Sequence, residues 1–209
     1  MGTVLISDSS LSWRTFDCLF DGTAHFRLSR EAKKSILVSH QLLNNIIDTG
    51  DQIYGVNTGF GKLSNISIKI EDLKQLQLNL VKSHACGVGK PLGSGVTRIT
   101  MVLKLMTWAK GYSGISPKLS QLLLDMLNHD ILPVIPRKGS VGASGDLAPL
   151  AHMACAMIGE GDVFFQDRII NFPSILFIFF LFSKSVWLHS SINCKCSYSF
   201  SKFKIFCFH

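Results

Sequence analysis

Apolar residues recur at helical spacing through most of the first 158 residues, and this pattern constrains the fold more than any other feature of the chain. Between residues 30 and 48, leucine and isoleucine side chains stand three or four positions apart, which would place them on one face of a helix. Ser29 can cap the start of this helix, and Gly50 can end it because glycine adopts a positive φ at little steric cost. These signals predict a long amphipathic helix over about 30–48.

Further helices are predicted downstream, and loops separate them. They span about 71–84, 95–110, 117–128 and 146–158. Ser116 and Pro117 are typical of an N-cap followed by the first helical residue. Residues 54–62 and 139–145 are rich in glycine and should form loops, and residues 132–136 should be extended. The sequence therefore predicts a mainly α fold.

The composition changes near residue 166. All 14 acidic residues lie at or before Asp167, whereas residues 171–209 hold nine of the 15 phenylalanines and show no lasting helical or strand period. We therefore expect one domain over residues 1–166 and a divergent tail over residues 167–209 that is not part of its fold. The longest apolar run in the tail has eight residues, and a membrane span needs about 20, so a membrane partner is not expected.

The net charge of +7 does not predict a nucleic-acid partner, because most of the excess belongs to the tail. Residues 1–167 carry 16 basic and 14 acidic side chains, and the last 42 residues carry five basic side chains and no acidic one. The six cysteines are scattered and form no Cys-x-x-Cys pair, which argues against a zinc site or a disulfide framework. Reduced thiols and the lack of a signal-peptide pattern predict a cytoplasmic protein without a metal.

The segment Gly139–Leu150 is the most specific feature for function, and it reads Gly-Ser-Val-Gly-Ala-Ser-Gly-Asp-Leu-Ala-Pro-Leu. Glycines bracket Ala143 and Ser144, so the backbone can bend and bring the Gly145 amide nitrogen against the Ala143 carbonyl carbon. Loss of one water would close a five-membered imidazolone, and loss of the Ser144 hydroxyl as a second water would leave an exocyclic methylidene. A helix starting at Asp146 would aim its amide dipoles at this ring and raise its electrophilicity.

Other structures are compatible with parts of this segment. A serine-hydrolase elbow needs glycine two positions after the serine, where this chain has Asp146, and Ala-Ser-Gly alone is common in simple turns. The whole string of twelve residues resembles the prosthetic-group motif of the aromatic amino-acid ammonia-lyases, and the similarity covers about residues 24–166. The resemblance implies that Ala143, Ser144 and Gly145 form 4-methylideneimidazol-5-one in the folded protein, without a diffusible cofactor.

The same resemblance implies the N-terminal domain of the ammonia-lyase fold, a fumarase/aspartase-like helical fold, without most of its central helical bundle. Members of the family are more than twice as long as this chain and form homotetramers whose active sites combine residues from different subunits. Their C-terminal half supplies an arginine for the substrate carboxylate and a glutamate near the amine, and those motifs do not occur here. We therefore expect a truncated chain with weak or absent activity of its own, whose assembly is in doubt.

A second segment, Tyr54–Gly61, lies at the separation from the first that the family shows. It is not a phosphate-binding loop, because Val56 and Leu63 stand where that loop needs a glycine and a Ser or Thr. The resemblance implies that Tyr54 lies on a loop over the active site and takes the β-proton of the substrate. This role requires surroundings that stabilise a phenolate.

Ser83 and His84 form a third patch, which is similar to the pair in histidine ammonia-lyases. An imidazole there can hydrogen-bond an imidazole substrate, and a phenyl substrate cannot reciprocate. Asn57 favours the same substrate, so Ser83, His84 and Asn57 are the predicted substrate-binding residues. The expected reaction is elimination of ammonia from the small molecule L-histidine to give trans-urocanate, the first step of histidine degradation. Two alternatives stay open: a phenylalanine or tyrosine ammonia-lyase or aminomutase, and a non-catalytic chain that associates with full-length subunits.

Overall fold

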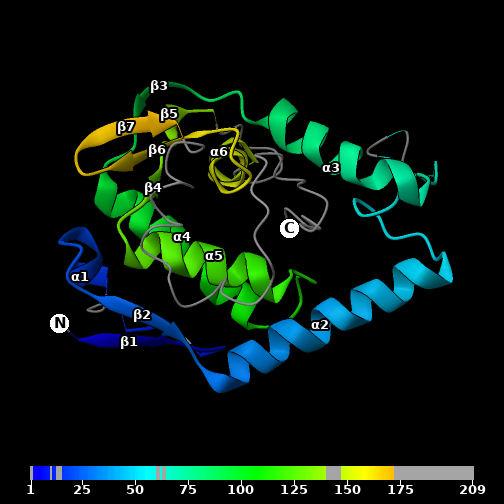
Figure 1. The fold of residues 1–209 in the computed structure, drawn as a ribbon, viewed down its shortest axis with the longest axis horizontal. Coiled ribbons are helices and arrows are strands. Elements are labelled where there is room, and N and C mark those ends of the chain that lie inside the picture. The colour runs from blue at the N-terminus through cyan, green and yellow to red at the C-terminus, as the bar shows by residue number, and fades with distance from the viewer. Residues whose placement is uncertain are drawn as a thin grey trace, which may run out of the picture.

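The computed structural model describes residues 2–9, 11–12, 16–59, 62, 65–139 and 147–171, and Figure 1 shows a mainly helical body. The helices of this part are α1 (Asp17–Phe20), α2 (Arg30–Thr49), α3 (Ile70–His84), α4 (Ser94–Ala109), α5 (Pro117–Asn128) and α6 (Leu147–Met157). The strands are β1 (Thr3–Ile6), β2 (His25–Leu28), β3 (Val88–Pro91), β4 (Leu132–Pro133), β5 (Pro136–Lys138), β6 (Asp162–Phe165) and β7 (Arg168–Asn171). The predicted mainly α fold is confirmed.

Local signals in the sequence explain where two of the helices begin and end. At the start of α2, Ser29 Oγ accepts a hydrogen bond from the backbone N–H of Ala32 at 3.0 Å, and Gly50 ends the helix with a φ of 82°. At the start of α5, Ser116 Oγ accepts from the backbone N–H of Leu119 at 3.2 Å. Each of these caps satisfies a terminal backbone group that the helix itself leaves unpaired.

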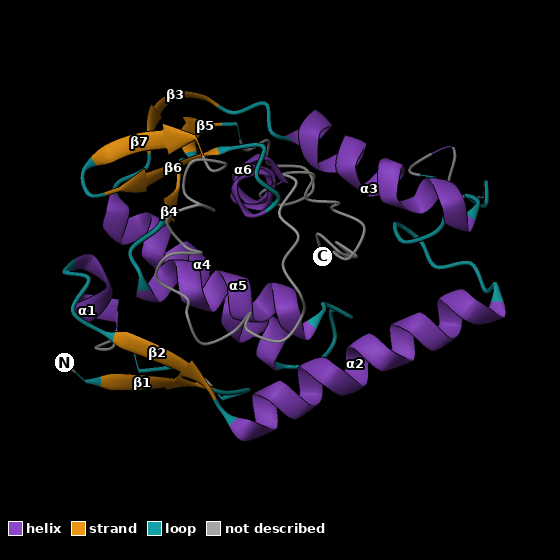
Figure 2. Ribbon diagram, viewed as in Figure 1, coloured by secondary structure: helices purple, strands orange, loops and turns teal. Residues whose placement is uncertain are grey.

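The described strands form small sheets at the edge of the helical body, drawn in orange in Figure 2. β1 pairs in parallel with β2, β3 pairs antiparallel with β5, and β6 lies between β4 and β7 in an antiparallel sheet. The β6–β7 hairpin turns at Gln166 and Asp167, which both have a positive φ, and it was not expected from the sequence. The hairpin carries the chain past residue 166, and the predicted boundary there stays a prediction because residues 172–209 lie outside the described part.

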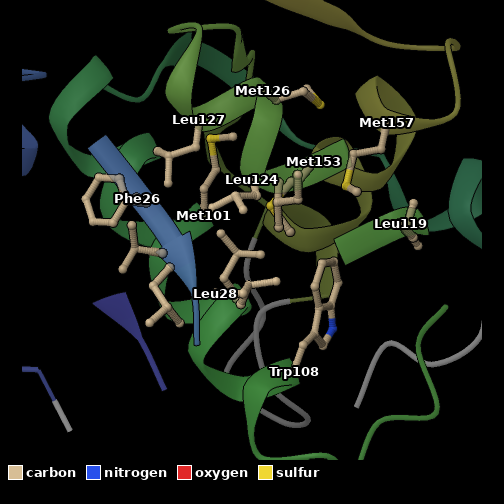
Figure 3. Packing of buried hydrophobic residues seen from close by; sticks show 14 of the residues in the cluster. Phe26, Leu28, Met101, Trp108, Leu119, Leu124, Met126, Leu127, Met153 and Met157 are labelled. Atoms are coloured by element: carbon tan, nitrogen blue, oxygen red, sulfur yellow. The ribbon is translucent and has the colours of Figure 1, made fainter. Parts of the chain in front are cut away.

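The main hydrophobic core surrounds α4. Met101 and Leu105 on this helix are fully buried in one cluster with residues of α5, α6 and β2. Figure 3 shows that Met101, Leu124 and Met153, which come from α4, α5 and α6, approach one another in this cluster. Truncation of a fully buried leucine such as Leu105 to alanine costs about 2–5 kcal/mol in cores of this kind. The core therefore fixes α6 relative to the α4–α5 pair.

Two smaller clusters hold α3, which is the helix that carries the predicted substrate-binding pair. Near its N-terminal end, Leu73 packs with Val56 and with Leu43 and Ile47 of α2. Near its C-terminal end, Val81 packs with Cys155 and Ile158 at the end of α6. α3 is thus fixed at both ends, against the segment that carries Tyr54 and against α6. None of the described helices combines the length and apolar character that crossing a membrane requires.

Candidate active site

Two of the segments singled out in the sequence meet where α3 ends. Gly87, three residues after His84, lies against Gly139, the first residue of the glycine-rich string. A Cβ on Gly139 would stand 2.9 Å from the Cα of Gly87 and 3.0 Å from the Cβ of Ala148, and real Cβ atoms are almost never found that close to other atoms. The two backbones can approach in this way because residue 139 is glycine and has no Cβ.

The imidazole of His84 is oriented by its own helix. Its Nδ1 lies 2.8 Å from the carbonyl oxygen of Leu80, one turn earlier, and 3.2 Å from Oγ of Ser83. A carbonyl oxygen only accepts, so the Nδ1–H must donate to it, and the neutral ring keeps an unprotonated Nε2. In its neutral form, the half-buried His84 therefore presents a hydrogen-bond acceptor at the C-terminal end of α3.

Ser83 contributes to the same arrangement from an exposed position. Its hydroxyl donates to the carbonyl oxygen of Leu80 at 2.9 Å, so Ser83 and His84 converge on one acceptor. The Ser83 hydroxyl thus takes part in orienting the ring of His84. Direct contact of Ser83 with a substrate stays a prediction.

The segment that carries Tyr54 is a compact loop organised by Asn57. Asn57 is buried, its Oδ1 accepts from the backbone N–H of Ile53 at 2.7 Å, and its Nδ2 donates to the carbonyl oxygen of Asp51 at 2.7 Å. Both ends of the amide are therefore engaged by backbone groups of the loop itself. Tyr54 is 53% exposed. The predicted contact of Asn57 with a substrate stays a prediction.

Gln77 on α3 is a site residue that sequence reasoning missed. It is buried, and its Nε2 donates to the carbonyl oxygens of Gly55 at 3.1 Å and Val56 at 3.3 Å. The loop of Tyr54 is thus bonded to the helix that ends at His84, seven residues or about 10 Å of helical rise further on. An amide at a position of the helical apolar face was the available signal, because Gln77 stands four residues after Leu73 and four before Val81.

His152 on α6 was also missed. Its Nε2 accepts a hydrogen bond from the backbone N–H of Gly87 at 3.0 Å, and burial lowers the pKa of its imidazole. The signal for it was a histidine in the otherwise apolar helix that follows the glycine-rich string. Burial also raises the pKa of the Cys155 thiol, and the nearby Glu160 carboxylate raises it further, so this cysteine stays protonated as part of the packing.

The residues that would form the electrophile, Ala143, Ser144 and Gly145, lie outside the described residues. The chain on either side of them is described, with Gly139 before the segment and Leu147, the first residue of α6, after it. In the described part of the chain, no group of His, Cys, Asp and Glu side chains is arranged to hold a metal ion.

Comparison with known proteins identifies a family that matches most of this chain. Residues 11–176 match the model of the family described as aromatic amino acid lyase. A histidine ammonia-lyase of Treponema denticola is 42% identical to this chain over 168 residues, which are 80% of this chain and 33% of that protein. The chain thus spans about a third of the length of the curated relatives that it matches.

Solved structures show the same partial coverage. The histidine ammonia-lyase of Trypanosoma cruzi superposes with a TM-score of 0.76 at 31% identity, over 85% of this chain and 34% of the other. The ergothioneine-degrading ergothionase of Treponema denticola superposes with a TM-score of 0.78 at 28% identity, over 82% of this chain and 34% of the other. The described fold is therefore the fold of about one third of these enzymes.

Proposed function

Because this chain belongs to the aromatic amino acid lyase family, we propose that it is the N-terminal part of an enzyme that eliminates ammonia from L-histidine and releases trans-urocanate. One observation carries the choice of substrate. The Nδ1–H of His84 is bonded to the carbonyl oxygen of Leu80, so Nε2 is left to accept an N–H from the imidazole of a substrate. A phenyl side chain has no such donor and would leave this acceptor unpaired.

The electrophile of the family would come from Ala143, Ser144 and Gly145 as a methylideneimidazolone, which supplies the carbon centre that makes the substrate amine a leaving group. The described ends of this segment fit such a group. Gly139 lies where a Cβ would collide with Gly87 and Ala148, so the start of the string is held against the turn after His84. α6 begins at Leu147, two residues after Gly145, and the N-terminal end of a helix favours negative charge.

Tyr54 would take the proton from the β-carbon of the substrate. Its loop is held by Asn57 and Gln77, and Tyr54 itself is about half exposed. Elimination breaks the Cβ–H bond and the Cα–N bond: the proton passes to Tyr54, the nitrogen leaves as ammonia, and the new double bond is that of urocanate. Through this loop, Asn57 would act on the reaction by positioning Tyr54, in addition to its predicted part in substrate binding.

The complete enzyme would be a cytoplasmic homotetramer that acts on a small amino acid and binds no nucleic acid. Since this chain spans about a third of its relatives, we expect weak or no turnover from the chain alone. A second candidate function, a non-catalytic chain that associates with full-length subunits, is favoured by the exposed apolar side chains Leu37, Val38 and Leu42 on α2.

A chimera tests the activity with the rest of the enzyme supplied. The 168 matched residues of this chain would replace their counterparts in the Treponema denticola histidine ammonia-lyase. We expect urocanate from L-histidine, no cinnamate from L-phenylalanine, and a mass lower than that of the unmodified chain by two waters. Ser144→Ala should abolish the product and retain the mass of at least one of these waters. An unchanged rate with Ser144→Ala would overturn the mechanism, and cinnamate as the main product would overturn the substrate.

His84 is tested in the same chimera. His84→Leu should raise the KM for L-histidine, because the acceptor for the substrate imidazole is lost. His129→Leu is the matched control, since His129 is exposed at the end of α5 and its Nδ1 bonds the carbonyl oxygen of Asp125 in the same way. Equal effects of the two substitutions would argue against a role of His84 in recognition.

A further inference from the structure

The contact between α6 and the turn after α3 joins two parts of the proposed site that lie far apart in the sequence. The backbone N–H of Gly87 donates to Nε2 of His152 at 3.0 Å, across 65 positions of the chain. Gly87 comes three residues after His84, and His152 lies on the second turn of α6, the helix that follows Ala143-Ser144-Gly145. This hydrogen bond therefore connects the substrate-recognising end of α3 with the helix next to the electrophile segment.

The packing around Gly87 leaves this connection little freedom. A Cβ on Gly87 would stand 2.9 Å from Nε2 of His152 and 3.2 Å from the Cβ of Pro136. On its other side Gly87 touches Gly139, which also touches Ala148 of α6. Gly87 is thus packed against α6, against Pro136 in the strand that leads into the glycine-rich string, and against Gly139.

The chemistry of the hydrogen bond fixes the state of His152. A backbone N–H only donates, so Nε2 must carry a lone pair and the ring must be neutral with its proton on Nδ1. Burial favours the same neutral state, because it lowers the pKa of the imidazole. Without this acceptor, the half-buried N–H of Gly87 would lose its partner, which costs about 1–3 kcal/mol for a buried donor.

We propose that His152 is a positioning residue, whose neutral imidazole holds the turn after His84 against α6 and so sets the distance between the substrate-recognising imidazole and the first turns of α6. The inference rests on the proposed function for the roles of His84 and Ala143-Ser144-Gly145. The hydrogen bond from Gly87 to His152 is itself formed between described residues. His152 acts through Gly87 and takes no part in the bond-breaking steps.

The hydrogen bond from Gly87 to His152 can be measured directly in the 209-residue chain labelled with ¹⁵N. An N–H···N hydrogen bond transmits a scalar coupling between its two nitrogens, so the amide nitrogen of Gly87 should couple to Nε2 of His152. The ¹⁵N shifts of the ring should show the proton on Nδ1. The half-buried His40 is an internal control, because its Nδ1 bonds the carbonyl oxygen of Gly114 and no such coupling to an amide nitrogen is expected. Absence of the coupling at His152 in a folded chain would overturn the proposal.

Two substitutions then separate positioning from packing. The side-chain amide oxygen of His152→Gln can reach the place of Nε2 and accept from Gly87, whereas His152→Asn is polar but too short. We expect the ring signals of His84 and the amide signal of Gly139 to shift in His152→Asn and to stay near their original values in His152→Gln. Unchanged signals of His84 and Gly139 in His152→Asn would overturn the positioning role, whatever the activity of the enzyme.

Kinetics of the chimera give the second readout. His152→Asn should lower kcat/KM for L-histidine by about tenfold to a hundredfold, the range that a displacement of about 1 Å can produce, and His152→Gln should restore most of it. A chimera that makes no urocanate, while the spectra show the hydrogen bond from Gly87 to His152, would refute the proposed function but not this hydrogen bond. A chimera that makes urocanate equally well with His152→Asn would refute the positioning role and leave the function intact.

Discussion

The amide of Gln77 donates a hydrogen bond to the carbonyl oxygen of Gly55, the residue that follows Tyr54, at 3.1 Å. The same amide lies 3.3 Å from the carbonyl oxygen of Val56, so one buried side chain of α3 serves two consecutive carbonyl groups of the loop. Loops usually vary in position more than the elements that they connect. This loop is instead attached to the helix that orients His84.

Loss of the Gln77 amide should therefore destabilise the protein. Gln77→Met keeps the length of the side chain but leaves two carbonyl groups without their donor, and we expect a loss of about 1–3 kcal/mol in the free energy of unfolding. Urea-induced unfolding measures it. Gln75→Met on the same helix is the control, because Gln75 is exposed and its amide donates to the side chain of Asn79, and it should change stability by less than about 0.5 kcal/mol. Equal losses from both would contradict the attachment.

Gly114 and Gly50 offer a matched test of packing at a positive φ. Their φ values are 62° and 82°, so alanine should be strained at both positions by about 1–2 kcal/mol. A Cβ on Gly114 would also stand 2.5 Å from Cδ2 of Leu43, a buried residue of the cluster that fixes α2, whereas a Cβ on Gly50 would meet nothing within 4 Å. We expect Gly114→Ala to cost about 1–3 kcal/mol more than Gly50→Ala in urea unfolding. Equal costs would show that Leu43 moves aside freely.

Arg98 should matter more to stability than Lys82, although each forms an ion pair. The guanidinium of Arg98 binds both carboxylate oxygens of Asp130 at 2.8 and 3.0 Å and also the carbonyl oxygen of Phe20 at 3.1 Å, and its side chain is only 12% exposed. The Lys82–Glu160 pair is about half exposed at both ends. Arg98→Met should cost about 2–3 kcal/mol and Lys82→Met about 0–1 kcal/mol, as read from thermal unfolding. The reverse order would disprove this ranking.

The state of His152 predicts how stability depends on pH. Burial lowers its folded pKa below the ordinary value of 6.5, so the unfolded chain binds the proton first as the pH falls. The stability contributed by neutral His152 is thus complete above pH 6.5 and is lost as the pH falls from there through the folded pKa. His152→Gln has no proton to bind, so its stability should fall less steeply than that of the wild type below pH 6.5. Parallel curves from denaturant titrations at several pH values would contradict the neutral state.

The sequence alone predicted the elements whose signals are local. The caps at Ser29 and Ser116 and the glycine end of α2 depend on one or two side chains next to the helix end, and the apolar periodicity depends on neighbours three and four positions away. The β6–β7 hairpin was missed because two non-glycine residues, Gln166 and Asp167, take up a positive φ at its turn, and neither is a strong signal for it.

In the candidate site, too, the local contacts could be predicted from the sequence and the long-range contacts could not. Ser83 and His84 are neighbours in the chain, so their common bond to the carbonyl of Leu80 lies within one helical turn. The partners of Gln77 and His152 lie more than 20 and 60 positions away, and no periodicity or spacing connects residues over such distances. Such pairs become visible only when the packing of α3 against α6 and against the loop of Tyr54 is known.

α3 bonds the loop of Tyr54 through Gln77 and carries the imidazole of His84 at its C-terminal end. A shift of this helix along its axis would therefore move both groups together and leave their separation unchanged. The position of both groups relative to Gly139 and α6 depends instead on the contact between Gly87 and Gly139 and on the hydrogen bond from Gly87 to His152. A change in the spacing between the end of α3 and α6 should therefore come from substitutions in α6 at its approach to Gly87, and substitutions elsewhere along α3 should leave this spacing as it is.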